Sequence, residues 1–488
     1  MQVDMIGLAS VGFIAAIAAW IFAARFSKFV TIAGGVVSFS LAVSLISKVS
    51  EAGSVSVGTF LYVDPLSLVF LIPTCFLYLA TAIFSAGYVH PPAGYAWVRY
   101  MRNFYAGLNL FCWAMIAALV VNGLALIWIA IEITTVVSVL LVAIDRTDGA
   151  SEAAWKYLLI ASLGLGIGLI ATIFIYAAGS HSLGSSYNLS FNVLISSASS
   201  FPPQVVRLAF VLAVIGYGTK VGFFPVHTWL PDAHSEAPTP VSALLSGSLL
   251  SVSFYAILRF FQVTEKAVGS EFPRGVLLIF GLASLGTAAL YLVSQRDIKR
   301  LLGYSSIEHM GILAVGMSFA APIAVFGVLL HVIAHALAKG GAFFGAGSIL
   351  RKFQTKDMAR IRGGMGLLPW SGPMFLLAVL ALSAMPPFGI FRSEFLIVMG
   401  ALQGHDNVAA VALVVFVTMA FFGLTYFATR TILTPTSGAA SQGLKVGEPS
   451  SYIVVAMGLC LLGLVILGVH PPGQLVNLIA SAARELRG

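Results

Sequence analysis

The sequence predicts an all-α polytopic membrane protein, and three observations support this fold class. The chain has 488 residues, of which 59% are hydrophobic and only 9% are charged, whereas a soluble chain carries about 25% charged residues. Apolar runs close to the ~20 residues that cross a bilayer recur along its whole length. Almost no polar sequence separates these runs, so the backbone must satisfy its own hydrogen bonds, and a helical bundle does this without open edges.

We expect about fourteen membrane-spanning helices. The N-terminal residues 1–4 lack the positive charges of a secretory signal, so the first apolar run is expected to be retained as a helix. Two of the spans are interrupted by helix breakers, one near Gly222 and Pro225 and one at Pro386–Pro387. The expected spans are 5–24, 29–48, 65–86, 104–121, 123–144, 155–179, 206–230, 237–262, 274–294, 301–319, 321–350, 369–403, 408–433 and 451–470.

The charges in the loops predict the orientation of the chain. Loops on one side of the membrane hold Arg25, Lys28, Arg99, Arg102, Arg146, Lys156, Arg296, Lys299, Arg300, Arg351, Lys352, Lys356, Arg360, Arg362, Arg430 and Lys445. Loops on the other side hold only Lys48, Arg207, Lys266, Arg274, Arg484 and Arg487. Cytoplasmic loops collect Lys and Arg, so the first side is predicted to be cytoplasmic and both termini to lie outside. This bias also explains the net charge of +8 without nucleic-acid binding.

The positions of the interrupted helices predict an internal repeat. They are the seventh and twelfth expected spans, so they run in opposite directions. Discontinuous helices of opposite orientation are typical of inverted repeats that line a polar path near the membrane midplane. We therefore predict an inverted-topology repeat whose two interrupted helices lie five spans apart. The segment 180–205 is predicted to be an external connection.

Glu132 is the first of four costly ionisable positions. Ionisable groups inside membrane helices cost several kcal/mol and usually mark transport pathways. Glu132 lies within "ALIWIAIEITTVVSVL", where Thr135 follows at i+3 and Ser138 lies further along, so the helix carries a narrow polar stripe. The alternative is a neutral glutamate that a neighbouring hydroxyl or backbone group satisfies.

Lys220 lies five residues before Pro225 in "GYGTKVGFFPVHTWLPDAHSEAPTPVSALLSG". Proline disrupts the helix, and lipid tolerates the exposed backbone only where protein or water satisfies it. A lysine beside such a break can give up its proton when it is desolvated. A lysine that reaches to the membrane interface is the alternative, but the adjacent break argues against it.

The run "HVIAHALAKG" places His331, His335 and Lys339 on one helical face. A pair of histidines at this spacing suggests a metal site, but no acidic residue shares the face, so we predict no metal ligand. Imidazole titrates near neutrality, and a hydrated row of groups that pass a proton fits better. Glu394 follows the second helix break as Lys220 precedes the first, and an ion pair with Arg392 is its structural alternative.

Two weaker features have simpler interpretations. The run "SLGLGIGLI" superficially looks like a glycine-rich nucleotide loop, but it lies inside a span, so Gly164 and Gly168 are predicted to form a helix-packing face. The three cysteines, Cys75, Cys112 and Cys460, lie singly in apolar runs and predict neither a metal site nor an iron–sulfur site. We therefore expect no cofactor in this chain.

Four motifs carry a family resemblance. "TKVGFFPVHTWLPDAHSEAPTPVSALLSG", "QRDIKRLLGYSSIEHMGI" at 295–312, "HVIAHALAKGGAFFGAGSI" at 331–349 and "MPPFGIFRSEFL" at 385–396 occur in order. They resemble the antiporter-like proton-pumping subunits of respiratory complex I, Mrp cation/proton antiporters and group 4 membrane-bound hydrogenases. Glu308 and His309 in "SSIEHMG", together with "SEFL", look most like the F-type subunit of hydrogenase-4. The resemblance covers at least residues 104–433. It implies fourteen helices with two inverted five-helix repeats, 104–262 and 274–433, three helices before them in 1–103, and a last helix and tail in 451–488.

The resemblance implies roles for single residues. Glu132 would be the acidic partner of Lys220 in an ion pair, and Lys339 would be the central relay lysine with His331 and His335 beside it. Glu394 would be the last charged group of the path. His227 and Asp232 are expected near the cytoplasmic mouth. Many relatives carry a lysine or histidine where Ser251 stands, so a gap is expected here unless His227 or water bridges it.

The predicted function is proton translocation without redox chemistry in this chain. Iron–sulfur and nickel–iron or flavin centres would lie on partner subunits of a bacterial or archaeal cytoplasmic membrane complex, so the sequence does not identify the electron donor or acceptor. The coupling ion is predicted to be H⁺, with Na⁺ left open. Three alternatives remain: an Mrp-like Na⁺/H⁺ antiporter, a secondary carrier for a small organic solute, and a mainly structural scaffold.

Overall fold

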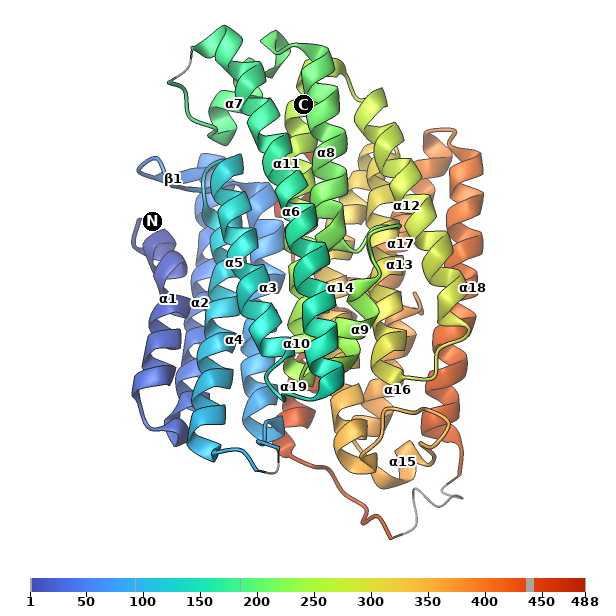
Figure 1. Cartoon of the computed structure of the whole chain (residues 1–488). Helices are drawn as coiled ribbons and strands as arrows, with labels where there is room; N and C mark the ends of the chain where they lie inside the picture. Colours follow the sequence, from blue (N-terminus) through green and yellow to red (C-terminus); the bar gives the residue numbers. More distant parts are fainter. Residues whose placement is uncertain (1, 93, 185, 436–442, 488) are drawn as a thin grey trace.

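The structure is a computed structural model that describes residues 2–92, 94–184, 186–435 and 443–487. Its helices form a bundle and run along one common axis (Figure 1). Up to residue 268 they are α1 (Gln2–Ile21), α2 (Ala24–Ala52), α3 (Pro65–Tyr88), α4 (Trp97–Val120), α5 (Leu124–Val142), α6 (Asp148–Leu183), α7 (Phe191–Ser197), η1 (Ala198–Ser200), α8 (Pro203–Val221), α9 (Trp229–Glu236), α10 (Thr239–Leu244), η2 (Leu245–Leu249) and α11 (Leu250–Val268).

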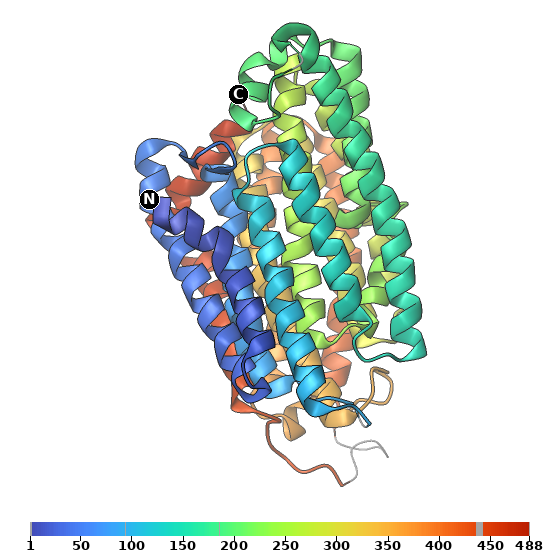
Figure 2. The same ribbon diagram turned by 60° about the vertical axis from the view of Figure 1, so that its left-hand side comes forward.

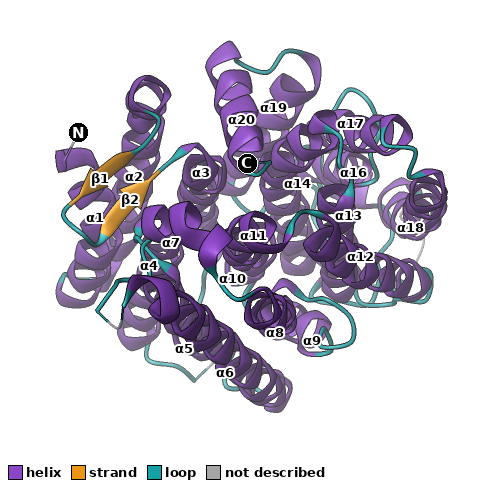
Figure 3. Ribbon diagram, turned by 90° about the horizontal axis from the view of Figure 1, so that it is seen from above, coloured by secondary structure: helices purple, strands orange, loops and turns teal. Residues whose placement is uncertain are grey.

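The remaining helices complete the bundle around α14. They are α12 (Glu271–Leu292), α13 (Ile298–Ser318), α14 (Pro322–Phe353), α15 (Gly364–Leu367), α16 (Ser371–Leu382), α17 (Gly389–Gln403), α18 (Asn407–Leu433), α19 (Ser451–Val469) and α20 (Gly473–Glu485). Seen along the bundle axis, α10, α11 and α14 lie inside, and α1, α6 and α18 lie at the periphery (Figure 3). The helix that holds two of the predicted histidines is therefore central.

Twelve of the described helical segments are long and apolar enough to cross a membrane, if Thr239–Val268 counts as one segment. Each of the twelve coincides with an expected span, so the chain is an integral, multi-pass, all-α membrane protein, as predicted. The other two expected spans are α13, which carries three charged residues, and the pair α16 and α17, with 12 and 15 residues. The total of fourteen stays a prediction.

Both predicted helix breaks are confirmed. Helix α8 ends at Val221, Gly222 takes the left-handed conformation with φ 89°, and α9 begins at Trp229. Helix α16 ends at Leu382, and α17 begins at Gly389 after a turn in which Ala384 has φ 53°. The inverted relation of the two halves stays a prediction.

A hydropathy pattern does not predict some of the elements. Strands β1 (Val55–Val57) and β2 (Leu61–Val63) pair antiparallel between α2 and α3. Helix α7 lies within the segment expected to be an external connection, and the amphipathic α20 occupies the expected tail. Helices α4 and α6 also begin seven residues before their expected spans, because a helix continues past the apolar layer into polar sequence that hydropathy does not count.

Glycines allow α6 and α8 to pack closely. A Cβ atom on Gly216 of α8 would lie 2.5 Å from the backbone nitrogen of Gly168, and one on Gly164 would lie 2.4 Å from Thr219 Oγ1. The predicted small-residue packing face of α6 is therefore confirmed, because the two backbones meet there. This contact helps to place the C-terminal end of α8, where Lys220 lies.

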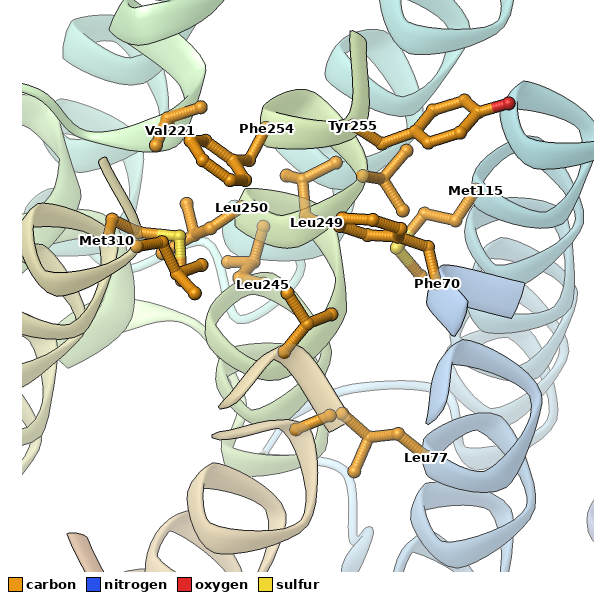
Figure 4. Close-up of a cluster of buried hydrophobic side chains, with 14 of the residues drawn as sticks. Phe70, Leu77, Met115, Val221, Leu245, Leu249, Leu250, Phe254, Tyr255 and Met310 are labelled. Carbon is orange, nitrogen blue, oxygen red and sulfur yellow. The ribbon is translucent and has the colours of Figure 1, made fainter. Parts of the chain in front are cut away.

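A buried apolar cluster surrounds the start of α11. Figure 4 shows that side chains of α3, α4, α8, η2, α11 and α13 converge on it. The labelled members are Phe70, Leu77, Met115, Val221, Leu245, Leu249, Leu250, Phe254, Tyr255 and Met310. Val221 directly follows Lys220, and Met310 directly follows His309, so this apolar cluster borders both predicted charged regions.

Candidate functional site

The predicted site residues lie inside the bundle. Eight of the nine are buried, and Glu132 is half-buried. They come from α5 (Glu132), α8 (Lys220), the α8–α9 break (His227), α13 (Glu308 and His309), α14 (His331, His335 and Lys339) and α17 (Glu394). Buried ionisable groups in a membrane bundle need partners or water, so their contacts decide what they can do.

Lys220 is fully buried, and neutral oxygen atoms of α5 surround its ammonium group. The Nζ atom donates to the Ile131 carbonyl at 3.2 Å, to Thr134 Oγ1 at 2.9 Å and to Thr135 Oγ1. A lysine ammonium has three N–H donors, so these three acceptors use all of them. The ring of Tyr157 lies 5.7 Å from Nζ on another side.

The expected Glu132–Lys220 ion pair is not formed in this structure. Among the residues described, no carboxylate lies within 4.0 Å of the Lys220 ammonium. Ser162 donates to Glu132 Oε1 at 3.4 Å, and Glu132 Oε2 is buried without a hydrogen-bond partner. Two threonine hydroxyls and a carbonyl occupy the place that the sequence assigned to the carboxylate.

Lys339 has the same kind of environment, which α13 provides. Its Nζ donates to the Leu302 carbonyl at 3.0 Å and to Ser305 Oγ, and both acceptors belong to α13. Glu308, one turn further along α13, is 2% exposed, and its Oε2 has no partner. Each of the two lysines therefore sits beside an under-satisfied carboxylate without pairing to it.

Three buried histidines of α13 and α14 form a cluster on the same two helices as Lys339 and its acceptors. His309 Nδ1 lies 3.1 Å from His331 Nε2, and His331 Nδ1 lies 3.0 Å from Ser393 Oγ. The His335 ring lies 5.1 Å from the His309 ring, and neither of its nitrogens has a partner. The structure thus brings His309 of α13 into the histidine row of α14.

Glu394 is the acidic side chain beside the histidine cluster. It is 9% exposed, and its carboxylate lies within 4.8 Å of the ring nitrogens of His309 and His331. Within the part of the chain that the structure describes, Arg392 has no carboxylate within 4.0 Å. The geometry therefore favours a histidine partnership for Glu394 over the ion pair with Arg392.

The same three residues could hold a metal ion. His309, His331 and Glu394 are the one group of potential metal ligands found in the described ranges, and two imidazoles with a carboxylate are donors that zinc accepts. The histidine face of α14 carries no acid, as the sequence indicates, but α17 supplies one from another helix, so the expectation of no metal ligand stays a prediction. A metal ion would occupy the nitrogen lone pairs that proton transfer needs.

Sequence reasoning missed His234 and several hydroxyls. His234 of α9 is fully buried; its Nδ1–H donates to the Leu230 carbonyl at 2.9 Å, and Nε2 has no partner. Its ring lies 5.6 Å from the ring of Phe343, one turn beyond Lys339. The sequence did offer a signal for His234, because it is a single histidine among apolar residues next to the first helix break. The acceptors Thr134 and Ser305 give no such signal, because hydroxyls are common in membrane helices.

The expected gap at Ser251 is present. Ser248 and Ser251 are buried, and their hydroxyls have no partner. Ser246 in the π-helical turn η2 lies 2.7 Å from Ser306 of α13. Among the described residues, the hydrogen bonds of Lys220 lead to α5 and those of Lys339 lead to α13, and no hydrogen bond joins the two groups.

His227 lies in the first break and Asp232 in the first turn of α9, and their position near a cytoplasmic mouth stays a prediction. His227 is 6% exposed, its Nδ1 has no partner, and its ring lies 5.8 Å from the Phe224 ring. Asp232 pairs with Lys156 at 3.4 Å and with Arg300 at 3.2 Å, and these are partly exposed side chains. Asp232 therefore belongs to a surface ion-pair network at the break.

This geometry defines a class of protein. It is a membrane bundle with interrupted helices and a buried row of lysine, histidine and glutamate side chains. Residues 121–422 match the family described as "NADH:quinone oxidoreductase/Mrp antiporter, TM". The chain belongs to this family.

Three known proteins illustrate what this chain is similar to in sequence and in structure. The hydrogenase-4 component F homolog of Methylacidiphilum infernorum (isolate V4) is 39% identical over 364 residues, which cover 72% of this chain and 75% of the relative. A chain of the archaeal membrane-bound sulfane sulfur reductase has a TM-score of 0.87 at 18% identity and covers 100% of this chain and 98% of its own. A chain of Thermus thermophilus respiratory complex I with bound NADH has a TM-score of 0.82 at 20% identity, over 99% and 100%. These two structures share the fold.

Proposed function

We propose that this chain is the proton-translocating, antiporter-like membrane subunit of a multisubunit redox-driven pump of the group 4 hydrogenase or complex I type. The observation that carries the proposal is the pair of fully buried lysines, Lys220 and Lys339, whose ammonium groups contact only neutral oxygens. Burying an unneutralised ammonium costs several kcal/mol, and such positions in membrane helices usually carry ions.

The first step would occur at Lys220. An approach of Glu132 toward the ammonium stabilises the charged lysine, and a retreat of Glu132 to the separation seen here leaves the charge supported by hydroxyls alone. The proton then leaves more easily, because an opposite charge no longer favours the ammonium form. Ser162, which donates to Glu132 Oε1 at 3.4 Å, offers the retracted carboxylate a partner.

The second step would carry the proton to Lys339. In this proposal the Ser246–Ser306 pair and His234 take part in the transfer, and water must enter the bundle between the two lysines. From Lys339 the proton would pass along the histidines to Glu394, which lies within 4.8 Å of two ring nitrogens. Imidazole both accepts and donates a proton near neutrality, which suits an intermediate carrier.

Partner subunits would supply the driving force. The relatives and structural neighbours include multisubunit respiratory complexes, so we propose further membrane and peripheral subunits that hold the redox centres. We place the complex in a bacterial or archaeal cytoplasmic membrane with both chain termini outside, because basic residues concentrate in one set of loops. H⁺ is the proposed coupling ion, since the buried groups all exchange protons.

The test is Lys220→Ala in the purified complex, reconstituted into liposomes and driven by a K⁺ diffusion potential, with an entrapped pH-sensitive dye as readout. Lys266→Ala is the matched control, because Lys266 is an exposed lysine at the end of α11. We expect Lys220→Ala to abolish proton uptake and Lys266→Ala to leave it intact. Unchanged uptake in Lys220→Ala would favour a scaffold, and uptake that requires Na⁺ would favour a Na⁺/H⁺ antiporter.

A further inference from the structure

A large groove opens between α1, α4 and α5. The three helices lie side by side in both side views (Figures 1 and 2). The cavity has a volume of about 990 Å³, at the upper end of the roughly 300–1,000 Å³ typical of small-molecule sites. Ile17, Leu110 and Leu140 are among the side chains that give it apolar walls.

One end of the groove is basic. Arg99 lies in the first turn of α4, Arg146 follows the end of α5, and both line the cavity and are exposed. Among the described residues, neither guanidinium has a carboxylate within 4.0 Å. The nearby Asp145 carboxylate accepts the Tyr100 hydroxyl at 2.7 Å. Two arginines without acidic partners at one end of an apolar groove favour an anionic ligand with an apolar tail.

A second polar group points to the same ligand. Asn103 also lines the cavity, one turn along α4 from Arg99, and its Oδ1 atom is buried without a hydrogen-bond partner. A buried amide oxygen costs free energy unless a donor reaches it. A hydroxyl group carried by the same ligand would satisfy it.

Aromatic side chains place the basic end at the level of lipid headgroups. Trp20 at the end of α1 and Tyr95 before α4 line the groove beside the arginines, and the Arg146 guanidinium lies 5.9 Å from the centre of the Tyr95 ring. Trp and Tyr concentrate at the membrane–water interface, and basic pockets between transmembrane helices bind anionic headgroups. Leu140 is 67% exposed, so the groove is open along its side.

We propose that this groove binds one anionic glycerophospholipid of the phosphatidylglycerol type. Its phosphate contacts Arg99 and Arg146, its headgroup hydroxyls reach Asn103, and one acyl chain lies along the apolar walls between α1 and α5. A lipid satisfies the charge, the unpartnered amide and the apolar walls with one molecule. The lipid site does not depend on the proposed proton relay, so the failure of one proposal leaves the other unaffected.

The test measures lipid retained by the detergent-purified complex after delipidation and incubation with mixed micelles of phosphatidylglycerol or phosphatidylcholine. We compare wild type with Arg99→Gln/Arg146→Gln, and with Arg360→Gln/Arg430→Gln as a control of equal charge change. Loss of two charge-assisted contacts should weaken phosphatidylglycerol retention by about tenfold or more, with no change in the control.

Two further measurements keep the proposal falsifiable if the double variant folds poorly. Asn103→Leu should also lower phosphatidylglycerol retention, and phosphatidylglycerol should raise the melting temperature of the wild-type complex more than phosphatidylcholine does. Equal retention of both lipids by wild type, full retention by the double variant, or a partner helix seated in the groove in a density map of the complex would each overturn the proposal.

Discussion

Replacing Thr135 by valine removes one of the three hydrogen-bond acceptors of the Lys220 ammonium and keeps a similar side-chain shape. Thr135 is fully buried on α5. After the substitution, Nζ keeps only the Ile131 carbonyl at 3.2 Å and Thr134 Oγ1 at 2.9 Å. No water from outside replaces the lost oxygen easily, because Lys220 has no exposed surface.

The expected magnitude follows from the charge on the donor. A hydrogen bond to a charged group contributes about 1.5–3 kcal/mol, which is roughly 10- to 150-fold in the balance between the charged and the neutral lysine. If every transported proton must recharge Lys220, transport should fall by about tenfold or more. The loss should be smaller than in Lys220→Ala, which removes the carrier itself.

The assay is proton uptake into liposomes that contain the purified complex, driven by a K⁺ diffusion potential. Thr74→Val is the matched control: Thr74 is buried on α3, and its hydroxyl donates to the Phe70 carbonyl at 2.8 Å without contact to a lysine. We expect the control to transport like wild type. Equal transport by Thr135→Val, Thr74→Val and wild type would refute a role for the Lys220 hydrogen bonds.

Three other predictions concern the relay exit, helix packing and pH. Glu394→Gln should lower proton uptake strongly while Glu271→Gln, at an exposed position, should not; equal uptake would remove Glu394 from the path. Gly216→Ala should destabilise the protein by about 1–3 kcal/mol, because the new Cβ would lie 2.5 Å from the α6 backbone, whereas Gly275→Ala meets nothing within 4 Å; thermal unfolding checks this, and similar melting temperatures would contradict it. Burial and a neighbouring carboxylate raise the pKa of Glu485 from 4.5 to about 8, so stability should fall as pH rises through this window and Glu485→Gln should flatten the fall; parallel pH profiles would disprove it.

The helical bundle could be predicted because a lipid environment requires this kind of structure. Long apolar runs must be helices in a bilayer, and the proline and glycine clusters around Pro225 and Pro386 interrupt helices wherever they occur. The hairpin β1–β2 and the helix α20 were not predictable in this way, because they lie outside the long apolar runs.

The identity of the costly residues was also readable, but their partners were not. A helical sequence fixes which side chains share a face, as for His331 and His335. It does not say which helix faces them, so His309 and Ser393 beside His331 became visible only in the bundle. The missing Glu132–Lys220 contact has the same origin, since the packing of α8 against α6 and α11 determines which atoms of α5 the ammonium meets.

The sequence by itself determined that this chain spans a membrane, where its two broken helices lie and which ionisable residues fall inside its helices. Only the tertiary structure decided that two threonines hold Lys220, that Glu394 joins a histidine cluster and that the two lysines bond to different helices, α5 and α13. The physical reason is that insertion into lipid depends on the composition and period of single segments, whereas contacts between segments depend on how helices rotate and approach. Small contacts, such as Gly216 against Gly168, set that approach.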